Sequence, residues 1–341
     1  MITNIKDIII QKIASFQKLD KDSIIVLNEV KSNNIATLGD KRKPLCLINL
    51  KKINDIKRIN KFHESINSKL NNQDIYVSCA ELLEERRKRF RNQIPFGFKN
   101  LIRIIDFLYR RVFPKLPILK QVYFFITKGH NRVISKAEVL GRVISCGFNV
   151  LEYFEYENLL YIISEKIKNP DFNMKVSYGA LFKMNRVGYQ GKIIGVYKLR
   201  TMYPYSEYCQ ELIMRENKLA KSGKILNDFR ITTWGKFFRK IWLDELPMFI
   251  NFFKREVGLV GVRPLSITYF KKYPKDLQDL RIKTKPGLLP PYYADLPQSF
   301  DEILLSEQKY LKQKLKKPFA TDLKYFYLAV TNIVFKGARS K

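Results

Sequence analysis

The chain has 341 residues and a mass of 40.4 kDa, enough for two globular domains or one large one. Hydrophobic residues make up 46% of it, and glycine (15) and proline (14) are few, which excludes collagen-like, low-complexity and wholly disordered chains. Lysine and arginine number 63 against 32 acidic residues, a formal net charge of +31. This surplus predicts a polyanionic partner: nucleic acid, an anionic membrane surface or phosphorylated substrates.

The cysteines and histidines indicate which kinds of fold and site are not expected. Cys46, Cys79, Cys146 and Cys209 lie far apart and form no CxxC pair, which argues against a disulfide framework and fits a reduced, cytoplasmic location. Only two histidines are present, which argues against a zinc site or a histidine-based triad. No stretch of 18 or more residues lacks charge, so no ordinary transmembrane helix is expected, and the first residues show no secretory pattern.

Residues 1–168 are predicted to form an N-terminal α/β domain. Two short strands, 44–50 and 74–80, enclose an amphipathic helix at 54–70. Farther on, a helix at 135–148 precedes two strands within 150–167. Together these elements faintly resemble a degenerate Rossmann-like or methyltransferase-like domain. No glycine-rich nucleotide loop follows a first strand, so no cofactor is expected there.

A basic, aromatic region at 86–128 lies within this domain. It holds twelve lysines and arginines and one acid, Asp106. Its segment 97–113 has helical periodicity, with an aliphatic and aromatic face opposite a charged one, and Pro114 follows directly. Such a helix suits a membrane interface, whereas an ordinary surface helix packed on a core produces the same pattern.

After a polar linker at 168–178, a second domain is predicted at 175–341. Its start reads as a β-hairpin that turns at residues 188–191. The later elements are a polar helix and loop (202–228), helices (231–242, 246–255 and 273–283), a short strand or turn (258–264), a proline-rich loop (285–297) and a helical tail from Phe300. The expected fold class is therefore α/β plus α+β: a small Rossmann-like domain, then a mostly helical domain with a β-hairpin.

The pair Asp244-Glu245 carries chemistry most directly. It precedes Pro247 at the start of a predicted helix, and helix capping alone explains an acidic pair in such a place. A second interpretation rests on the basic neighbours, which are Arg230, Lys236, Arg239 and Lys240 before the pair and Lys254, Arg255 and Arg263 after it. Cations bind phosphate oxygens, and carboxylates hold Mg²⁺ or attack phosphorus. A helix start would also lower the pKa of Asp244 and keep it ionised.

Three segments resemble the signature blocks of the bacterial sugar transferases, the monotopic phosphoglycosyl transferases. They are RVGYQGKIIGVYKLRTM (186–202), DFRITTWGKFFRKIWLDELPMFIN (228–251) and GLVGVRPL (258–265). Within them stand five ordered blocks that are similar to the family's RxGxxG hairpin, K-F-R-T/S-M, D-P-R-I-T, R-x-x-x-L-D-E-L-P-Q and S-L-V-G-P-R-P. The order of the blocks is more specific than any single motif, and the resemblance covers roughly residues 175–290.

The resemblance implies a reaction and assigns roles. The family transfers a sugar-1-phosphate from a nucleotide-diphospho-sugar to a polyprenyl phosphate and releases a nucleoside monophosphate. Asp244 matches the nucleophile, which forms an aspartyl-phosphosugar intermediate, and Glu245 matches its neighbour, implicated in Mg²⁺ binding. The residues expected to bind substrate phosphate are Arg239, Arg263, Lys198, Arg200 and Arg230.

Other residues in these blocks have plainer explanations. Lys198 and Arg200 would be read as solvated strand ends if the other blocks were missing. Arg186 and Gly188 are accounted for by hairpin chemistry alone. Trp242 and Phe249 are expected in the core.

The resemblance also implies a place in the cell. The family acts on the cytoplasmic face of the inner membrane and begins capsule, exopolysaccharide or O-antigen assembly. Its usual member carries a hydrophobic re-entrant helix before the hairpin, but residues 165–179 here are too polar to enter a bilayer. Val262 replaces a proline of the P-R-P turn, and Met248 replaces a glutamine. We expect a divergent, peripheral or monotopic member in which residues 97–126 contact the anionic membrane.

Two alternatives remain at this level. A nucleic-acid-binding protein would explain the charge and the aromatic residues, but no RRM, KH or helix-turn-helix motif is found, so no nucleic-acid partner is expected. A catalytically silent scaffold of a polysaccharide pathway would explain the departures from the family pattern. The presence of both Asp244 and Glu245 argues against such a scaffold, because a silent protein has no catalytic need to keep them.

Overall fold

The computed structural model describes residues 5–17, 23–27, 45–93, 98–116, 118–170, 172, 178–216 and 228–338. The chain divides into two compact units, each described by itself: an N-terminal unit (Met1–Tyr178 and Met202–Ile231) and a C-terminal unit (Gly179–Thr201 and Thr232–Lys341). The sequence placed 202–231 in the second domain, whereas this segment packs with the first because Cys209, Leu212 and Ile213 enter its core. More than half of the predicted linker 168–178 lies outside the described residues.

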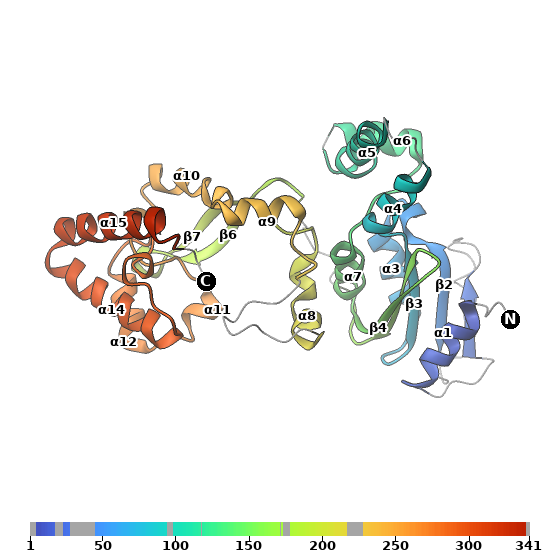
Figure 1. The fold of residues 1–341 in the computed structure, drawn as a ribbon. Coiled ribbons are helices and arrows are strands. Elements are labelled where there is room, and N and C mark those ends of the chain that lie inside the picture. The colour runs from blue at the N-terminus through green and yellow to red at the C-terminus, as the bar shows by residue number, and fades with distance from the viewer. Residues whose placement is uncertain are drawn as a thin grey trace. The chain divides into compact units, whose positions relative to one another are not determined.

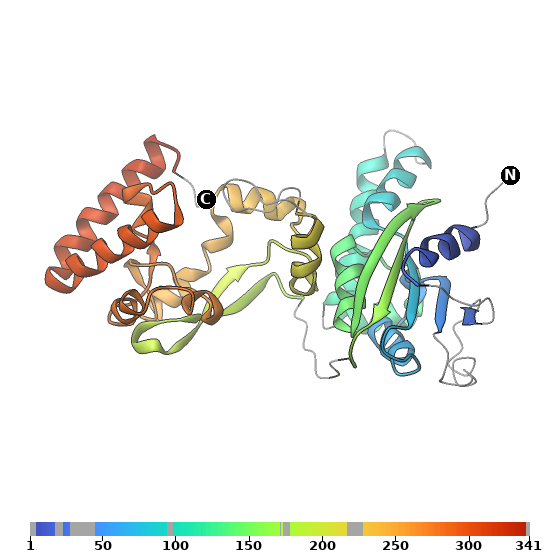
Figure 2. The ribbon, with the colours of Figure 1, turned by 90° about the horizontal axis from the view of Figure 1, so that it is seen from below.

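The N-terminal unit is a five-stranded sheet covered by helices on both faces (Figures 1 and 2). The strand order is β1-β2-β3-β5-β4; β1, β2 and β3 are parallel, and β5 runs antiparallel to β3 and β4. The strands are β1 (Ile24–Leu27), β2 (Cys46–Lys52), β3 (Ile75–Ala80), β4 (Phe148–Tyr156) and β5 (Leu159–Lys166). Four of them match predicted strands, but β1 was not predicted.

Alternate strand residues fill two hydrophobic cores. Leu47 and Tyr76 face α3 (Ile59–Asn67) and α7 (Lys136–Ser145), both predicted from the sequence. Cys46 and Ile48 face the opposite side, where α1 packs. The helix α1 (Ile5–Ala14) was not predicted, and its residues Ile9 and Ile13 are buried there. The remaining helices of this unit near the sheet are α4 (Leu83–Gln93), α8 (Gln210–Glu216) and the 3-10 turns η2 (Ile53–Asp55) and η7 (Ser206–Cys209).

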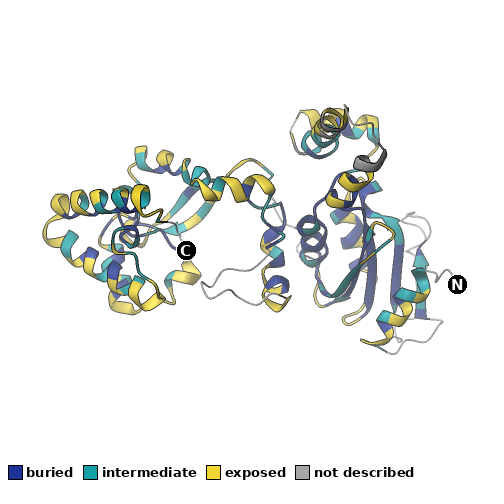
Figure 3. Cartoon of the chain, in the orientation of Figure 1, coloured by how far each residue is buried: buried dark blue, intermediate teal, exposed yellow. Residues whose placement is uncertain are grey.

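The basic, aromatic region forms a helical arm, defined here as residues 98–128. It consists of α5 (Lys99–Phe107), the π-helical turn η4 (Leu108–Val112), the 3-10 turn η5 (Phe113–Lys115) and α6 (Leu119–Thr127), so the predicted helix at 97–113 is confirmed over most of its length. Arg86 of α4 binds Asp106 through two hydrogen bonds of 2.9 and 2.8 Å, which joins the arm to α4. Tyr123 is buried, whereas much of the rest of the arm is exposed (Figure 3).

The C-terminal unit combines two small sheets with helices. β6 (Leu181–Val187) and β7 (Ile193–Leu199) form the predicted antiparallel hairpin, and η6 (Tyr189–Gly191) is its turn. β8 (Gly258–Val260) and β9 (Gly287–Leu289) pair in parallel. The helical elements are α9 (Thr233–Lys240), η8 (Leu243–Glu245), α10 (Met248–Phe253), α11 (Ile267–Phe270), α12 (Lys275–Ile282), α13 (Tyr292–Asp295), α14 (Phe300–Lys316) and α15 (Pro318–Phe335).

The prediction of a plain loop at 285–297 is wrong, because this segment contains both β9 and α13. Two glycines make the strand pairing close: a Cβ on Gly287 would lie 2.1 Å from the Gly261 nitrogen. Tyr310, Leu311 and Tyr325 of α14 and α15 pack with Val260 and Val262 in the core of this unit. Among the described helices, none is long and apolar enough to cross a bilayer.

Candidate functional site

Asp244 and Glu245 lie in η8, the single 3-10 turn between α9 and α10. The turn begins after Trp242, whose backbone is left-handed (φ 58°) and whose ring meets Tyr293 edge-on at 5.3 Å. A left-handed non-glycine residue is strained, and such strain is common at functional sites. The capping interpretation is wrong: the N-cap of α10 is Pro247, and no side-chain hydrogen bond caps it.

Glu245 is bound by two cations. Lys198 of β7 donates a hydrogen bond of 2.5 Å to Glu245 Oε1, and Arg263 donates one of 3.3 Å to the same oxygen. Burial alone would raise the pKa of Glu245, but Lys198 and Arg263 outweigh it and hold the pKa below its usual value. Glu245 is therefore an anion that brings two cations together, Lys198 and Arg263.

Asp244 differs from its neighbour. Its carboxylate makes no hydrogen bond or ion pair with another residue in the described part of the chain. Burial raises its pKa, with Glu245 adding to the rise and the charges of Lys198 and Arg239 opposing it. The expected lowering of this pKa by a helix start is thus wrong, because Asp244 does not sit at a helix N-terminus and burial dominates. Within the described part of the chain, the two carboxylates of η8 therefore differ in their partners.

Arg239 is held near the pair by a close packing of α9 on the end of β7. Thr232 caps α9, its Oγ1 accepting from Gly235 N at 2.8 Å, and its own amide donates to the Thr201 carbonyl at 2.9 Å. A Cβ on Gly235 would lie 2.0 Å from that carbonyl oxygen, so only glycine fits. Arg239 Nε then donates to Thr201 Oγ1 at 3.0 Å.

Asn251 fixes the other side of the turn. This fully buried side chain accepts from Tyr197 N at 3.0 Å and donates to the Gly195 carbonyl at 2.9 Å, which joins α10 to β7. Lys198 follows Tyr197 on the same strand, so the amide sets the approach of Lys198 to Glu245. Sequence reasoning missed this residue, and its only signal was a polar side chain in an otherwise apolar helix.

Arg263 follows β8 and is positioned by aromatic and charged partners. Its guanidinium donates to the Tyr292 hydroxyl at 3.3 Å, and its carbonyl accepts from Arg281 at 2.5 Å. Arg281 also pairs with the buried Glu307. Tyr292 lies in the segment that was predicted as a loop, so its role could not be read from the sequence.

A cavity of about 320 Å³ opens beside Glu245. Three cations line it, Arg186, Lys198 and Arg263, with Glu245 as its only acid. Arg186, assigned to hairpin chemistry alone, therefore contributes its charge to the cavity. Asp244 does not line this cavity, although it lies on the same turn as Glu245.

Other predicted residues lie elsewhere. Arg200 donates to the Gly179 carbonyl at 2.9 Å and stacks over the Phe182 ring at 5.1 Å. Arg230 belongs to the N-terminal unit, where it pairs with Asp228 through bonds of 2.9 and 2.7 Å and donates to Gln210 at 2.5 Å. The phosphate-binding roles of both arginines stay predictions.

Two residues near the acidic pair were predicted to lie in the core, and the structure buries them to different extents. Trp242 is half-buried against Tyr293, but the assignment of Phe249 to the core is wrong, because it is exposed. The helices α9 and α10 and the residues between them expose a set of large apolar side chains on both sides of the acidic pair: Trp234, Phe237, Ile241, Leu246, Phe249, Ile250 and Phe253.

The donor set permits a metal only together with substrate. Among the described residues, no group of three or more histidine, cysteine, aspartate or glutamate side chains is placed to hold a metal ion. Both cations bind Oε1 of Glu245, and among the described residues no hydrogen bond to its Oε2 is found. Mg²⁺ commonly takes one or two carboxylates and completes its shell with substrate phosphates and water, and this pair fits that pattern.

Comparison with known proteins identifies relatives of this region. Residues 171–336 match the family described as bacterial sugar transferase. The galactosyl transferase CpsE of Streptococcus agalactiae is 35% identical over 138 residues, which are 39% of this chain and 30% of that protein. The undecaprenyl-phosphate galactose phosphotransferase of Salmonella typhimurium is 36% identical over 114 residues (32% and 24%).

A third relative has the same limited overlap. The UDP-glucose:undecaprenyl-phosphate glucose-1-phosphate transferase of Klebsiella pneumoniae is 36% identical over 110 residues, 32% of this chain and 22% of that protein. The matches thus cover 30% or less of the length of these three relatives.

Proposed function

Because residues 171–336 of this chain belong to the bacterial sugar transferase family, we propose that it transfers a sugar-1-phosphate from a nucleotide-diphospho-sugar to a polyprenyl phosphate. The names of the Salmonella and Klebsiella relatives include undecaprenyl phosphate, which supports this acceptor class. The observation that carries the proposal is the asymmetry of the acidic pair: Glu245 is bound by Lys198 and Arg263, and Asp244 has no such partner among the described residues.

The proposed reaction has two displacements at one phosphorus atom. A carboxylate oxygen of Asp244 attacks the sugar-bearing phosphorus of the donor, and the bond from that phosphorus to the bridging oxygen breaks. The nucleoside monophosphate leaves with that oxygen. An oxygen of polyprenyl phosphate then attacks the same phosphorus, the bond to Asp244 breaks, and polyprenyl-diphospho-sugar is released.

The cations of the cavity would neutralise the phosphates. Arg186, Lys198 and Arg263 line it together, and the charge of Arg239 acts on Asp244. Phosphoryl transfer depends mainly on such positioning and charge neutralisation. Asp244 and Glu245 would hold Mg²⁺ with the donor phosphates, and that ion would supply further neutralisation of negative charge.

The acceptor implies a membrane surface next to the acidic pair. The exposed apolar side chains of α9 and α10 support this, because both helices adjoin the turn that carries Asp244 and Glu245. The arm is a second candidate for membrane contact, since Ile118 and Phe125 are more than four-fifths exposed among basic residues. We place the protein on the cytoplasmic face of the inner membrane, as a peripheral or monotopic enzyme that initiates polysaccharide assembly.

The N-terminal unit has a separate proposal. Its parallel strands β1, β2 and β3, with α3 connecting β2 to β3, support a Rossmann-like origin. The mostly helical C-terminal unit with its hairpin would be the catalytic domain.

One experiment tests the proposed function. Membranes containing the protein are incubated with a panel of UDP-sugars, polyprenyl phosphate and Mg²⁺, and UMP is measured. We expect UMP with at least one donor, and its loss in Asp244→Ala. The matched control is Asp276→Ala, an exposed aspartate of α12 in the same unit, which should leave UMP release unchanged. No UMP with any donor would favour the silent scaffold.

A further inference from the structure

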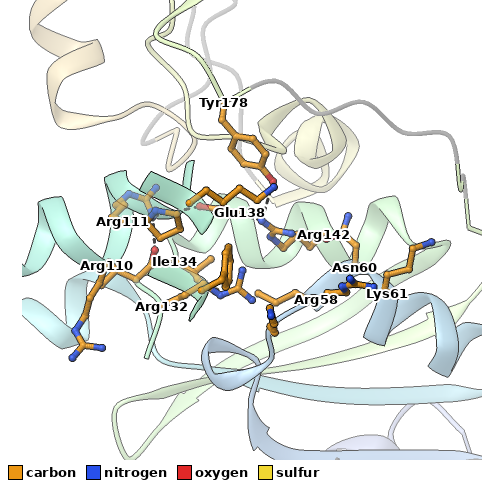
Figure 4. A pocket seen from close by; sticks show the side chains of 16 residues that line it. Arg58, Asn60, Lys61, Arg110, Arg111, Arg132, Ile134, Glu138, Arg142 and Tyr178 are labelled. Atoms are coloured by element: carbon orange, nitrogen blue, oxygen red, sulfur yellow. Dashed lines mark hydrogen bonds and ion pairs between the residues drawn. The ribbon is translucent and has the colours of Figure 1, made fainter. Parts of the chain in front are cut away.

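The N-terminal unit contains a second cavity with a strongly cationic lining (Figure 4). Its volume is about 400 Å³, within the range of small-molecule sites. Eight cations line it against one acid, Glu138. The cations are Lys57, Arg58, Lys61, Arg110, Arg111, Lys120, Arg132 and Arg142.

The single acid is already used inside the protein. Glu138 pairs with Arg111 at 3.3 Å and with Arg142 at 3.2 Å. Arg110 pairs outside the cavity with Asp106, and Lys61 with Glu64. Most of the positive charge is therefore not neutralised by the cavity's own residues, and an anion in the cavity would relieve the repulsion.

Two buried donors point to the same conclusion. The Nε atoms of Arg132 and Arg142 are buried and have no hydrogen-bond partner among the described residues, and the Arg142 side chain is more than nine-tenths buried. The other nitrogens of Arg142 donate to Asn60 at 2.5 Å, to Tyr178 at 3.1 Å and to Tyr205 at 3.3 Å. Buried donors without partners are rare in native proteins, and a bound ligand is one way to satisfy them.

A helix start adds a third source of positive potential. α3 begins at Ile59, and its N-cap, Arg58, makes no side-chain capping bond. Arg58, Ile59, Asn60 and Lys61 all line the cavity, so the first turn of the helix adjoins it. Uncapped backbone amides at a helix N-terminus bind phosphate groups readily.

The cavity also lies where α/β sheets bind their ligands. Residues 57–61 follow the carboxyl end of β2, and Ile134 bridges to Leu82, just beyond the carboxyl end of β3. Phe124 and Pro114 of the arm supply apolar surface on the other side. The cavity therefore offers cations for an anionic group and apolar contacts for an attached organic part.

We propose that this cavity binds a phosphate-bearing ligand, with its phosphate or diphosphate between the first turn of α3 and the arginines of η4 and α7. The phosphate could come from a soluble nucleotide or from the headgroup of an anionic lipid next to the arm. The site is distinct from the proposed catalytic site, because all its lining residues belong to the N-terminal unit.

The test is calorimetric titration of the full chain with pyrophosphate and with UDP in 150 mM salt. The variant Lys57→Glu/Arg58→Glu reverses two exposed charges of the cavity. It should weaken the binding of the phosphate probe to this cavity at least tenfold. The control Lys69→Glu/Lys168→Glu makes the same charge change at the opposite end of α3 and should alter affinity less than twofold. Arg263→Glu in the C-terminal unit should retain the binding that the first variant loses.

A vesicle arm separates the two sources of phosphate. One outcome would assign the phosphate to a lipid headgroup: phosphatidylglycerol vesicles bind the control variant but not the Lys57→Glu/Arg58→Glu variant, and neither pyrophosphate nor UDP binds. Binding of the soluble probes would assign a nucleotide. The proposal would be overturned if both double variants lost affinity equally. It would also be overturned if neither the soluble probes nor the vesicles showed binding that depends on Lys57 and Arg58. Melting curves of the two variants check that both fold.

Discussion

At the scale of single residues, two adjacent carboxylates are held in opposite electrostatic states. Glu245 is paired twice and its pKa is lowered, whereas Asp244 has no comparable partner in the part of the chain that the structure describes, and burial raises its pKa. The dipeptide itself was visible in the sequence as a candidate site. The difference between its members was not, because Lys198 and Arg263 reach it from β7 and from the residues after β8.

This difference predicts opposite effects on stability. At pH 7, Asp244→Asn should raise the melting temperature, because an ionised carboxylate with a raised pKa costs stability. Glu245→Gln should lower stability by about 1 kcal/mol, because it removes a paired anion. The Glu245 contribution is present above pH 4.5, its ordinary pKa, and disappears as the pH falls through the lowered folded-state value. Thermal melts of the two variants at pH 7 and pH 4 measure these changes in stability. Changes of melting temperature in the same direction at pH 7 would contradict the opposite electrostatic states of Asp244 and Glu245.

Catalysis should show the raised pKa of Asp244. The acid limb of kcat/KM for UMP release should lie above pH 3.8, the ordinary aspartate value, because only the ionised carboxylate attacks. Lys198→Met should move this limb to still higher pH, because Lys198 lowers the pKa of Asp244. Lys254→Met, an exposed lysine after α10, is the control. If the acid limb of the kcat/KM profile does not move in Lys198→Met, the group that titrates there is not Asp244.

At the scale of elements, the close approach of α9 to β7 positions Arg239. Gly235→Ala would put a Cβ 2.0 Å from the Thr201 carbonyl oxygen, so the helix must shift. We expect a loss of about 1–3 kcal/mol in stability and roughly a hundredfold slower UMP release. Gly258→Ala is the matched control, because its nearest contact is an ordinary 3.4 Å. Unchanged release in Gly235→Ala would show that the packing does not matter.

The sequence was a good guide to elements with a strong local pattern. The hairpin, α3, α7, α9, α10 and α12 follow from hydrophobic periodicity and turn residues. The elements β9 and α13 were missed because prolines suggest a loop, whereas their structure depends on Gly261 and Gly287 approaching each other across 26 residues of chain. β1 has only four residues, and α1 is stabilised by the packing of Ile9 and Ile13 against the sheet.

At the scale of the whole molecule, the sequence predicted two domains but not a discontinuous boundary. The segment 202–231 returns to the N-terminal unit because its apolar residues fit that core, and no local pattern encodes such a return. The five ordered blocks did identify the candidate site. They could not reveal Asn251 and Tyr292 as supporting residues, since their roles depend on contacts from distant strands and helices.

The net charge of +31 leaves lipid and nucleic acid open as polyanionic partners, and the exposed arm favours lipid. Ile118→Ser/Phe125→Ser removes the two most exposed apolar side chains of the arm, and we expect about tenfold weaker binding to phosphatidylglycerol vesicles. Phe16→Ser/Ile167→Ser, exposed residues outside the arm, is the control. Undiminished flotation of the arm variant, or salt-sensitive RNA binding without vesicle binding, would contradict the membrane role.

The proposed covalent intermediate on Asp244 is tested by mass spectrometry of the full chain after incubation with a reactive UDP-sugar and Mg²⁺ but no polyprenyl phosphate. We expect a mass increase of one phosphosugar, located on Asp244 by peptide fragmentation and removed when polyprenyl phosphate is added. Glu245→Gln should slow its formation, and Asp244→Asn should abolish both the adduct and UMP release. An adduct on another residue, or UMP release that persists in Asp244→Asn, would contradict the account.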